Sequence, residues 1–244
     1  GRPIYGSAAN ANNAFITKPG YPIASFYGYK YIGVFQSEEE LAKYPHLSGD
    51  KVGDGRYEDV NKDGVLDQND KTILGDNNPL FTAGFSNSFS YKNFTLDIQF
   101  TGSYGAEVFS FYKRMCGIYH GDRNGMIEQL GRWQSKDQPG DGIHFRPTRT
   151  PSGWQRDPSS AWVQDASYLR LRNLTLGYNF DQKVLDKMKM KGLRLYVTGQ
   201  NLFTITNYVG YDPETSSESG LAQGGDYLGY PAARSFIIGA NITF

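Results

Sequence analysis

Long apolar runs are missing from this sequence of 244 residues. No stretch approaches the roughly 18 consecutive apolar residues that indicate a transmembrane helix, although a membrane β-barrel, whose strands are short and half apolar, is not excluded. Cysteine occurs once, as Cys116, so the chain has no intramolecular disulfide and its redox compartment cannot be inferred. Neither charge is in excess, because 25 Lys and Arg balance 25 Asp and Glu, which gives no support to nucleic-acid binding.

Catalytic patterns are also missing. The three histidines, His46, His120 and His144, lack a metal-ligand spacing such as H-E-x-x-H, and no G-x-S-x-G, P-loop or G-x-G-x-x-G motif occurs. We therefore do not expect an enzyme. The chain starts with GRPIYGSAANANN, without an initiator Met or a signal peptide, and we expect a processed product or a piece of a longer chain.

The residues that are abundant indicate an all-β fold. Aromatic residues make up 15% of the chain, and there are 29 glycines. Strand side chains alternate between two faces, and five segments alternate apolar and polar residues in this way. One of them changes phase after Leu171, which predicts a β-bulge or a strand that extends beyond the buried zone. The predicted strands cover about residues 80–91, 93–103, 167–180, 193–203 and 234–244.

The connections between these strands alternate between short and long. Lys92 and Asn93 predict a hairpin, and a short helical turn that ends at Gly192 joins the third and fourth strands. The other connections are the long segments 104–166 and 204–232, and residues 1–79 precede the first strand. This alternation, together with aromatic residues at both strand ends, is typical of an outer-membrane barrel. A soluble β-sandwich is the alternative, since five strands alone cannot close a barrel.

Several longer motifs resemble one known family. They look like successive motifs of the SusC/RagA family, the TonB-dependent outer-membrane transporters of Bacteroidetes, in order and over nearly the whole chain. The stretches are PIASFYGYKYIGVFQSEEEL, GDGRYEDVNKDGVLDQNDKTILGDNNPLFTAGFSNSFSYKNFTLDIQFTGSYG, SSAWVQDASYLRLRNLTLGYNF, LRLYVTGQNLFTITNYVGYDPE and YPAARSFIIGANITF.

The resemblance implies the C-terminal part of such a transporter, located in the bacterial outer membrane. About five antiparallel strands would belong to the wall of a barrel of about 22 strands and would contact the lipid bilayer. Residues 1–79, 104–166 and 204–232 would be extracellular. The family imports oligosaccharides or peptides with a SusD-like surface lipoprotein as a lid. The plug, the remaining strands and the segment that contacts the TonB complex would lie upstream or on another chain.

The stretch DVNKDGVLDQND has the spacing of a calcium loop. Hard cations such as Ca²⁺ prefer six to eight oxygen ligands, and the loop offers them at the positions of an EF-hand loop, with Gly64 at the sharp turn. The last position is Asp instead of Glu, and no amphipathic helix precedes the loop. A metal-free acidic turn is the alternative. The predicted ligands of a structural Ca²⁺ are Asp59, Asn61, Asp63, the Val65 carbonyl, Asp67 and Asp70.

Aromatic residues in the segment 104–166 are candidates for substrate binding. Aromatic rings beside arginine side chains suit sugars or peptides, although in a long loop the same residues often form a small core of their own. The candidates are Tyr119, Trp133, Trp154 and Trp162. A second reading of the whole chain is a soluble or surface-attached, calcium-stabilised β-domain that binds glycan or protein.

Overall fold

The computed structural model describes residues 2–8, 11–117, 124–147, 158–215 and 219–244. It contains two compact units, each described here by itself. The sheet unit consists of residues 79–106, 166–213 and 230–244, and the loop unit consists of residues 1–78, 107–165 and 214–229. Within the described ranges, no helix is long and apolar enough to cross a membrane.

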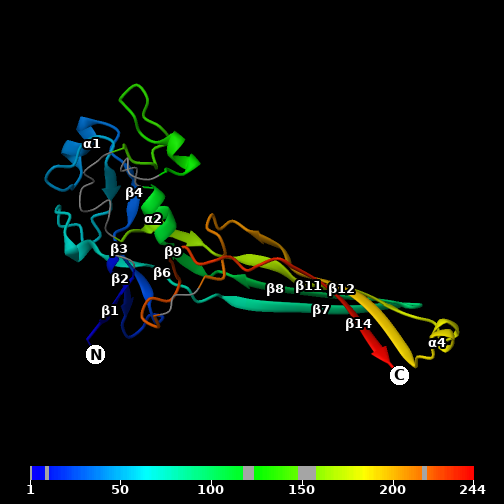
Figure 1. Cartoon of the computed structure of the whole chain (residues 1–244). Coiled ribbons are helices and arrows are strands. Elements are labelled where there is room, and N and C mark those ends of the chain that lie inside the picture. Colours follow the sequence, from blue (N-terminus) through cyan, green and yellow to red (C-terminus); the bar gives the residue numbers. More distant parts are fainter. Residues whose placement is uncertain (1, 9–10, 118–123, 148–157, 216–218) are drawn as a thin grey trace. The chain divides into compact units, whose positions relative to one another are not determined.

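One five-stranded sheet makes up most of the sheet unit (Figure 1). Its order is β14-β12-β11-β8-β7, and all neighbouring strands are antiparallel. The expected all-β fold of antiparallel strands is therefore confirmed. The strands are β7 (Phe81–Tyr91), β8 (Phe94–Tyr104), β11 (Tyr168–Asn179), β12 (Gly192–Thr206) and β14 (Ser235–Thr243).

The register of this sheet places most apolar side chains of the five strands on one face; Ile237, opposite Thr198, lies on the other. Residues directly opposite each other on neighbouring strands share a face, so each apolar residue extends a row that began on the strand before. Many of these side chains are exposed in the described part of the chain: Ile238, for example, is 83% exposed, whereas Leu171 is buried. One such row consists of Phe89, Leu96, Leu176, Val197 and Ile238, and the next of Tyr91, Phe94, Tyr178, Leu195 and Ala240.

Aromatic side chains contact one another at both ends of the sheet. At one end, the ring centroids of Phe94 and Tyr178 are 4.9 Å apart, and those of Tyr178 and Phe180 are 5.0 Å apart. At the other end, Phe81 and Tyr104 stack at 5.5 Å. Bands of aromatic residues at both ends of an apolar face are the arrangement found where a sheet crosses a membrane interface.

The polar face carries every charged residue of the five strands. They are Asp97, Arg170, Arg172 and Arg194. The Ser88 hydroxyl donates to the Asp97 carboxylate at 2.6 Å, and the Arg194 guanidinium lies 3.7 Å from the other oxygen of Asp97. The separation of charge from apolar surface is thus complete across this sheet.

A bulge in β11 keeps the apolar face continuous. Leu171 pairs with Phe100, and Asn173 pairs with the next residue of β8, so β11 contains one residue more than β8 at Arg172. An extra residue reverses the alternation that follows it. Leu171 and Leu174 therefore lie on the same face, and the change of phase in the sequence reports a bulge.

Arg170 anchors the chain that follows β12. Its Nε donates to the Thr204 hydroxyl at 2.8 Å, and its Nη2 donates to Asp212 at 2.5 Å. The second Asp212 oxygen accepts the backbone N–H of Ala232 at 3.0 Å. The Arg170 and Asp212 side chains are only 3% and 14% exposed, and breaking such a buried pair typically costs about 3–5 kcal/mol.

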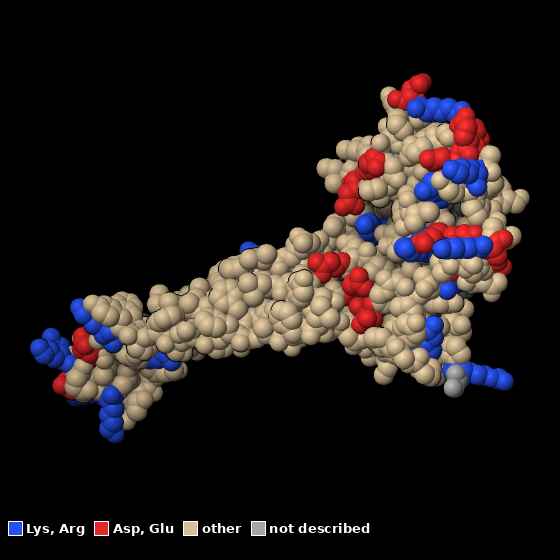
Figure 2. Space-filling view, turned by 180° about the vertical axis from the view of Figure 1, so that it is seen from behind, with Lys and Arg blue, Asp and Glu red and all other residues tan. Residues whose placement is uncertain are grey.

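Helix α4 (Gln182–Met188) connects β11 to β12. It ends earlier than the sequence predicted: Lys189, at φ 56°, adopts the left-handed conformation that closes the helix, and Gly192 is the first residue of β12. Figure 2 shows that charged side chains of the sheet unit gather at the end that carries α4, with little charge along the strands. The lysines in and after α4 are Lys183, Lys187, Lys189 and Lys191.

Among its described residues, the loop unit contains three small sheets, which the sequence analysis did not anticipate. In their order across each sheet, the strands are β1 (Ile4–Ala8), β2 (Ala11–Thr17), β3 (Ser25–Gly28) and β6 (Thr72–Gly75); β10 (Val163–Asp165), β9 (Glu107–Ser110) and β13 (Gly225–Asp226); and the pair β4 (Tyr31–Val34) and β5 (Gly55–Tyr57). The helical segments are α1 (Glu38–Lys43), η1 (Gln68–Asp70), α2 (Phe111–Gly117), η2 (Ile127–Gly131) and η3 (Ser160–Trp162).

Aromatic side chains from these small sheets and from the start of α2 form a core. Phe15, Phe26, Phe109 and Phe111 are fully buried, and the Phe109 and Phe111 ring centroids are 5.1 Å apart. Burying one such side chain contributes about 1.5–3 kcal/mol, which compensates for strands of only two to seven residues. A second cluster contains Tyr29, Tyr57 and Leu66.

Two carboxylates face each other in the sheet of β9 and β10. Glu107 lies directly opposite Asp165, and its Oε2 accepts the backbone N–H of Asp76 at 3.3 Å. Burial raises the pKa of Glu107; the hydrogen bond from Asp76 opposes this, and the charges of Asp76 and Asp165 add to it. A carboxyl group with a raised pKa binds its proton more tightly in the folded chain than in the unfolded one.

We expect Glu107→Gln to raise the Tm of the loop unit at pH 7 and leave it unchanged at pH 4. The pKa of Glu107 in the folded chain is raised above 4.5, so the wild-type protein loses stability as the pH rises from 4 to 7. Glutamine cannot ionise, so the variant does not have this loss. The group is half exposed, so a shift of only about 1–2 °C is expected. Thermal unfolding at both pH values measures it, and an equal shift at pH 4 would contradict the electrostatic cause.

We expect Leu174→Arg, in the middle of the apolar face, to destabilise the protein by about 2–4 kcal/mol in phospholipid, as a charge on the lipid side of a barrel does. Leu174 pairs with Ile98 and Gly199 on this face. The matched control is Ser86→Arg on the polar face, which should change the free energy of unfolding by less than about 1 kcal/mol. Denaturant unfolding of the reconstituted protein measures both, and equal effects of the two variants would count against lipid contact.

Candidate functional site

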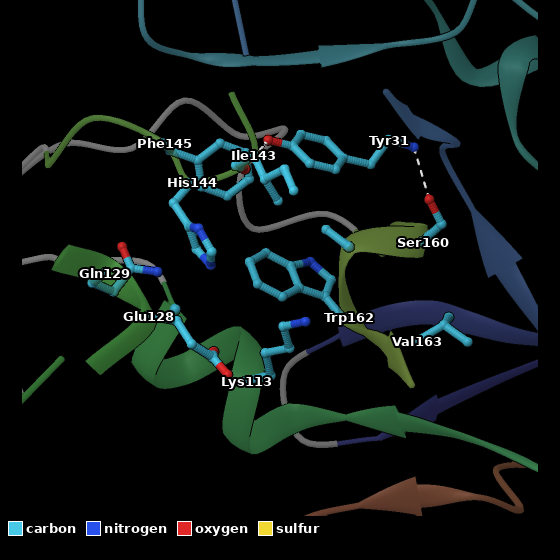
Figure 3. A pocket seen from close by; sticks show the side chains of 12 residues that line it. Tyr31, Lys113, Glu128, Gln129, Ile143, His144, Phe145, Ser160, Trp162 and Val163 are labelled. Carbon is cyan, nitrogen blue, oxygen red and sulfur yellow. Dashed lines mark hydrogen bonds between the residues drawn. The ribbon is translucent and has the colours of Figure 1, made fainter. Parts of the chain in front are cut away.

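A pocket of about 180 Å³ lies within the loop unit. Its walls come from β4, α2, η2, the segment 143–145, and η3 with the first residue of β10 (Figure 3). Hydrogen bonds join these distant segments: the Tyr31 N–H donates to the Ser160 hydroxyl at 2.9 Å, and the Trp133 N–H donates to the His144 carbonyl at 3.0 Å. The pocket is thus formed by packing of five segments rather than by one loop.

One wall of the pocket is aromatic. The Phe145 ring centroid lies 5.2 Å from that of Tyr31 and 6.0 Å from that of Trp162. The Tyr31 hydroxyl donates to the carbonyl of Ile143. Burial, with the nearby Tyr57 and Asp141, raises the pKa of Tyr31, so the hydroxyl stays protonated and keeps this hydrogen bond at every physiological pH.

Asp141 orients a histidine at this pocket. Its Oδ1 accepts the backbone N–H groups of Ile143 and His144 at 2.8 and 2.9 Å, and its Oδ2 lies 2.5 Å from His144 Nδ1. Burial acts to raise the pKa of Asp141, but these donors and the His144 ring outweigh it and lower the pKa. A carboxylate at Nδ1 holds the proton there and leaves Nε2 to the pocket, into which the ring points (Figure 3).

Three further polar side chains line the pocket: Lys113, Glu128 and Gln129. Gln129 is only 7% exposed, its amide points into the pocket (Figure 3), and no described residue forms a hydrogen bond with that amide. Lys113 and Glu128 are half-buried, and neither pairs with an oppositely charged side chain in the described part of the chain.

The aromatic residues predicted to bind substrate are divided between the core and ranges that are not described. Trp162 is 2% exposed, belongs to the core of the loop unit and lines the pocket. Trp133 packs against that core and covers Gly53, where a Cβ would lie 2.5 Å from the indole. Tyr119 and Trp154 lie outside the described residues. Contact of these residues with substrate stays a prediction.

The sequence analysis missed Gln129 and the pairing of His144 with Asp141. His144 had been considered only as a metal ligand. The aspartate three residues before it, followed by Gly142, was a local turn signal that could have indicated the hydrogen bond. Gln129 gave no signal, because its burial depends on chain segments far away in the sequence.

The acidic loop 59–70 folds tightly around its own carboxylates. The two oxygens of Asp59 accept the backbone N–H groups of Lys62 and Gly64 at 2.7 and 2.8 Å. Asp63 Oδ1 accepts the N–H of Val65 at 2.9 Å. Gly64 has φ +84°, in the left-handed region that favours glycine at the predicted sharp turn.

Asp70 closes this loop from inside. It is fully buried, and its two oxygens accept the N–H groups of Val60 and Asp67 at 2.9 and 2.8 Å. Asn61 Oδ1 accepts the N–H of Asp63 at 2.9 Å. Leu66, in the middle of the loop, packs with Tyr29 and Tyr57, which ties the loop to the second cluster.

The loop suits calcium in the type and order of its oxygen donors and in its turn at Gly64. Within the described ranges, however, no three His, Cys, Asp or Glu side chains lie close enough together to hold a metal ion. The six predicted ligands therefore stay a prediction.

No protein-family model matches the chain. The chain is 35% identical over 236 residues to TonB-dependent receptor P3 of Formosa agariphila, covering 94% of this chain and 23% of that protein. It is 32% identical over 250 residues to TonB-dependent receptor P26 of the same organism, covering 96% and 24%. With TonB-dependent receptor SusC of Bacteroides thetaiotaomicron the identity is 26% over 240 residues, covering 98% and 21%.

The fold is similar to that of solved structures. A structure of the RagAB peptide importer in the open-open state matches with a TM-score of 0.72 and 23% identity, covering 97% of this chain and 24% of that chain. A structure of the RagAB peptide transporter matches with a TM-score of 0.73 and 22% identity, covering 95% and 24%. The chain spans about a quarter of the length of the proteins it matches, and these relatives are receptors and transporters rather than enzymes. By sequence the chain is similar to part of the TonB-dependent receptors, SusC among them, and by fold it is similar to the RagAB structures, which supports a SusC/RagA-like C-terminal segment.

Proposed function

We propose that this chain serves in the TonB-dependent import of oligosaccharides or peptides across the outer membrane. The sheet unit forms part of the barrel wall, and the loop unit is extracellular and takes part in binding the substrate. The observation that carries the proposal is the continuous apolar face of five strands, with every charge of those strands on the opposite face. Such a face matches lipid on one side and a polar lumen on the other.

The partners follow from what the sheet leaves open. In the described part of the chain, β7 and β14 each pair on one side only, and an unpaired strand edge in lipid costs several kcal/mol for each backbone group. We propose that the remainder of the barrel and its plug, on the same or a separate chain, cover these edges. A SusD-like surface lipoprotein as lid and the TonB complex complete the assembly, in line with the similarity to SusC and RagAB.

We also propose that the loop 59–70 binds a structural Ca²⁺. Support comes from the spacing of its oxygen donors, the left-handed Gly64 and the attachment of Leu66 to a buried cluster. Because that cluster also contains Tyr29, which precedes β4, a bound ion would stiffen the part of the loop unit next to the pocket wall.

The alternative, a soluble β-domain that binds glycan or protein, receives no support from the sheet unit. A soluble domain rarely exposes an apolar patch larger than a few hundred Å². Here the apolar rows cross all five strands, and Phe236 and Ile238 on β14 are 72% and 83% exposed.

Uptake by cells tests the proposed import. We expect a strain that lacks the full-length receptor to lose uptake of one class of labelled compound, oligosaccharides or peptides, and the restored receptor to return it. A protonophore should abolish uptake while surface binding persists, since the TonB complex draws on the proton gradient. Unchanged uptake of both classes in the deletion strain would overturn the proposal.

Chelation and titration test the calcium loop. We expect Ca²⁺ at about 100 times its Kd to raise the free energy of unfolding of the loop unit by about 1–3 kcal/mol. Asp63→Ala should remove this gain. The matched control is Asp137→Ala at an exposed position outside the loop. Thermal unfolding in Ca²⁺, Mg²⁺ and chelator measures the effect, and a wild-type Tm that is indifferent to Ca²⁺ would rule the metal out.

A further inference from the structure

We propose that the end of the sheet unit that carries α4 binds the phosphate headgroups of anionic phospholipids, in the membrane leaflet on the side of the short strand connections. This rests on the proposed barrel wall, because it requires the apolar face of the sheet to lie in lipid. The feature that carries it is a lysine cluster at this end (Figure 2). Its members are Lys92, between β7 and β8, and Lys183, Lys187, Lys189 and Lys191, in and after α4.

Hydrogen bonds hold the two short connections against each other. The Asn93 side-chain amide, in the connection between β7 and β8, donates to Asp181 at 2.7 Å, and the Asn93 carbonyl accepts the N–H of Asn179 at 2.8 Å. On the other side of α4, the Lys191 N–H donates to the Thr243 carbonyl at 2.8 Å. Both connections and the end of β14 therefore lie together, and their lysines gather at one end of the sheet.

The cluster carries a net positive charge. All five lysines are exposed, and none forms an ion pair with a residue in the described ranges. The connection 181–191 contains two acidic residues, Asp181 and Asp186, so five lysines face two aspartates. Lysines at such a density attract an anionic membrane surface within a Debye length of about 10 Å.

The cluster begins where the apolar face ends. Lys92 stands between Tyr91 and Phe94, whose side chains are 72% and 50% exposed, and its Nζ lies 5.4 Å from the Tyr91 ring centroid. Bands of aromatic residues mark the membrane interface. A lysine beside such a band keeps its carbon chain along apolar surface and extends its ammonium group to the level of the headgroups.

Helix α4 has the composition of an interfacial helix. Leu185 is buried and α4 contacts β12, which fixes the helix to the sheet. Val184 and Met188, four residues apart on one side of the helix, are 40% and 46% exposed. Lysines next to exposed apolar residues are typical of helices that lie at a membrane surface.

The geometry favours a lipid surface over a single soluble anion. Exposed lysines from two separate connections form an open surface, which suits many phosphates fixed in one plane. With the loop unit extracellular, as proposed above, the short connections face the periplasm. The lipid at this end is therefore a phospholipid of the periplasmic leaflet.

Native mass spectrometry of the detergent-purified, full-length receptor tests the proposal. The probes are phosphatidylglycerol and phosphatidylcholine with the same acyl chains. We expect phosphatidylglycerol to bind at least about fivefold more tightly, the contribution of one lysine near an anionic surface. The combined variant Lys183→Gln, Lys187→Gln and Lys191→Gln should weaken the Kd of phosphatidylglycerol about tenfold or more and leave that of phosphatidylcholine unchanged.

Two matched variants separate charge from structure. Arginine at the same three positions keeps the charge and should keep the preference for phosphatidylglycerol. Glutamine at three exposed lysines of the loop unit removes the same charge elsewhere and should bind both lipids as the wild type does; these are Lys43, Lys51 and Lys136. Raising the ionic strength from about 0.05 to 0.5 M should weaken the preference of the wild type, which needs no substitution.

Several results would overturn the headgroup site. They are equal binding of the two lipids by the wild type, a preference that the glutamine variant retains, equal losses in the loop-unit control, and a preference that is insensitive to salt. Sedimentation with isolated peptidoglycan covers the other anionic surface of the periplasm. Retention that depends on the three lysines there, with no such dependence for phosphatidylglycerol, would assign the cluster to the cell wall instead.

These results are distinct from those of the uptake experiment. Unchanged uptake in the deletion strain would overturn the import function and leave the lipid measurement as it stands. A receptor that restores uptake and shows no preference for phosphatidylglycerol would keep the import function and refute the headgroup site.

Discussion

The hydrogen-bonded register of the five-stranded sheet is the constraint on which the rest of the sheet unit depends. A shift of one residue in any strand would move its apolar side chains to the polar face and its charged side chains to the apolar one. The bulge at Arg172 shows how strictly this is kept, because it restores Leu174 to the face of Leu171 after one extra residue. The two faces require different surroundings. The register therefore determines both the distribution of charge over the sheet and its suitability for a membrane.

The loop unit obeys a different constraint. Its strands are two to seven residues long, too short to be stable as isolated ribbons, so they depend on shared burial. Phe15, Phe26, Phe109 and Phe111 supply it from elements that are far apart in the sequence. The long connections of the sheet thus carry a folded body with a core of its own, and a core can hold a pocket in a fixed shape, which a flexible loop cannot do.

The two constraints explain what the sequence could predict. Long strands with one open face leave a pattern of period two, so β7 and β8 were visible directly, and even the bulge in β11 left a change of phase. The small sheets left no such pattern, because β9 pairs with β10 and β13, which both follow it in the sequence by more than fifty residues. The acidic loop was visible because its spacing is local, while Gln129 and the pocket it lines arise only when five distant segments meet. The helix stop was misplaced for a similar reason, since lysine at position 189 gives no signal for a left-handed conformation.

Trp162 belongs to the core of the loop unit and also lines the pocket. Its indole is 2% exposed, so most of its surface contributes to the core, and only its remaining edge is left to the pocket. Removing the indole would therefore act first on the stability of the loop unit. Gln129 is different, because its amide contributes no hydrogen bond to the described fold. Because this amide faces the pocket, water there can supply the partner that the described fold does not, so its position carries no penalty of a buried unsatisfied group.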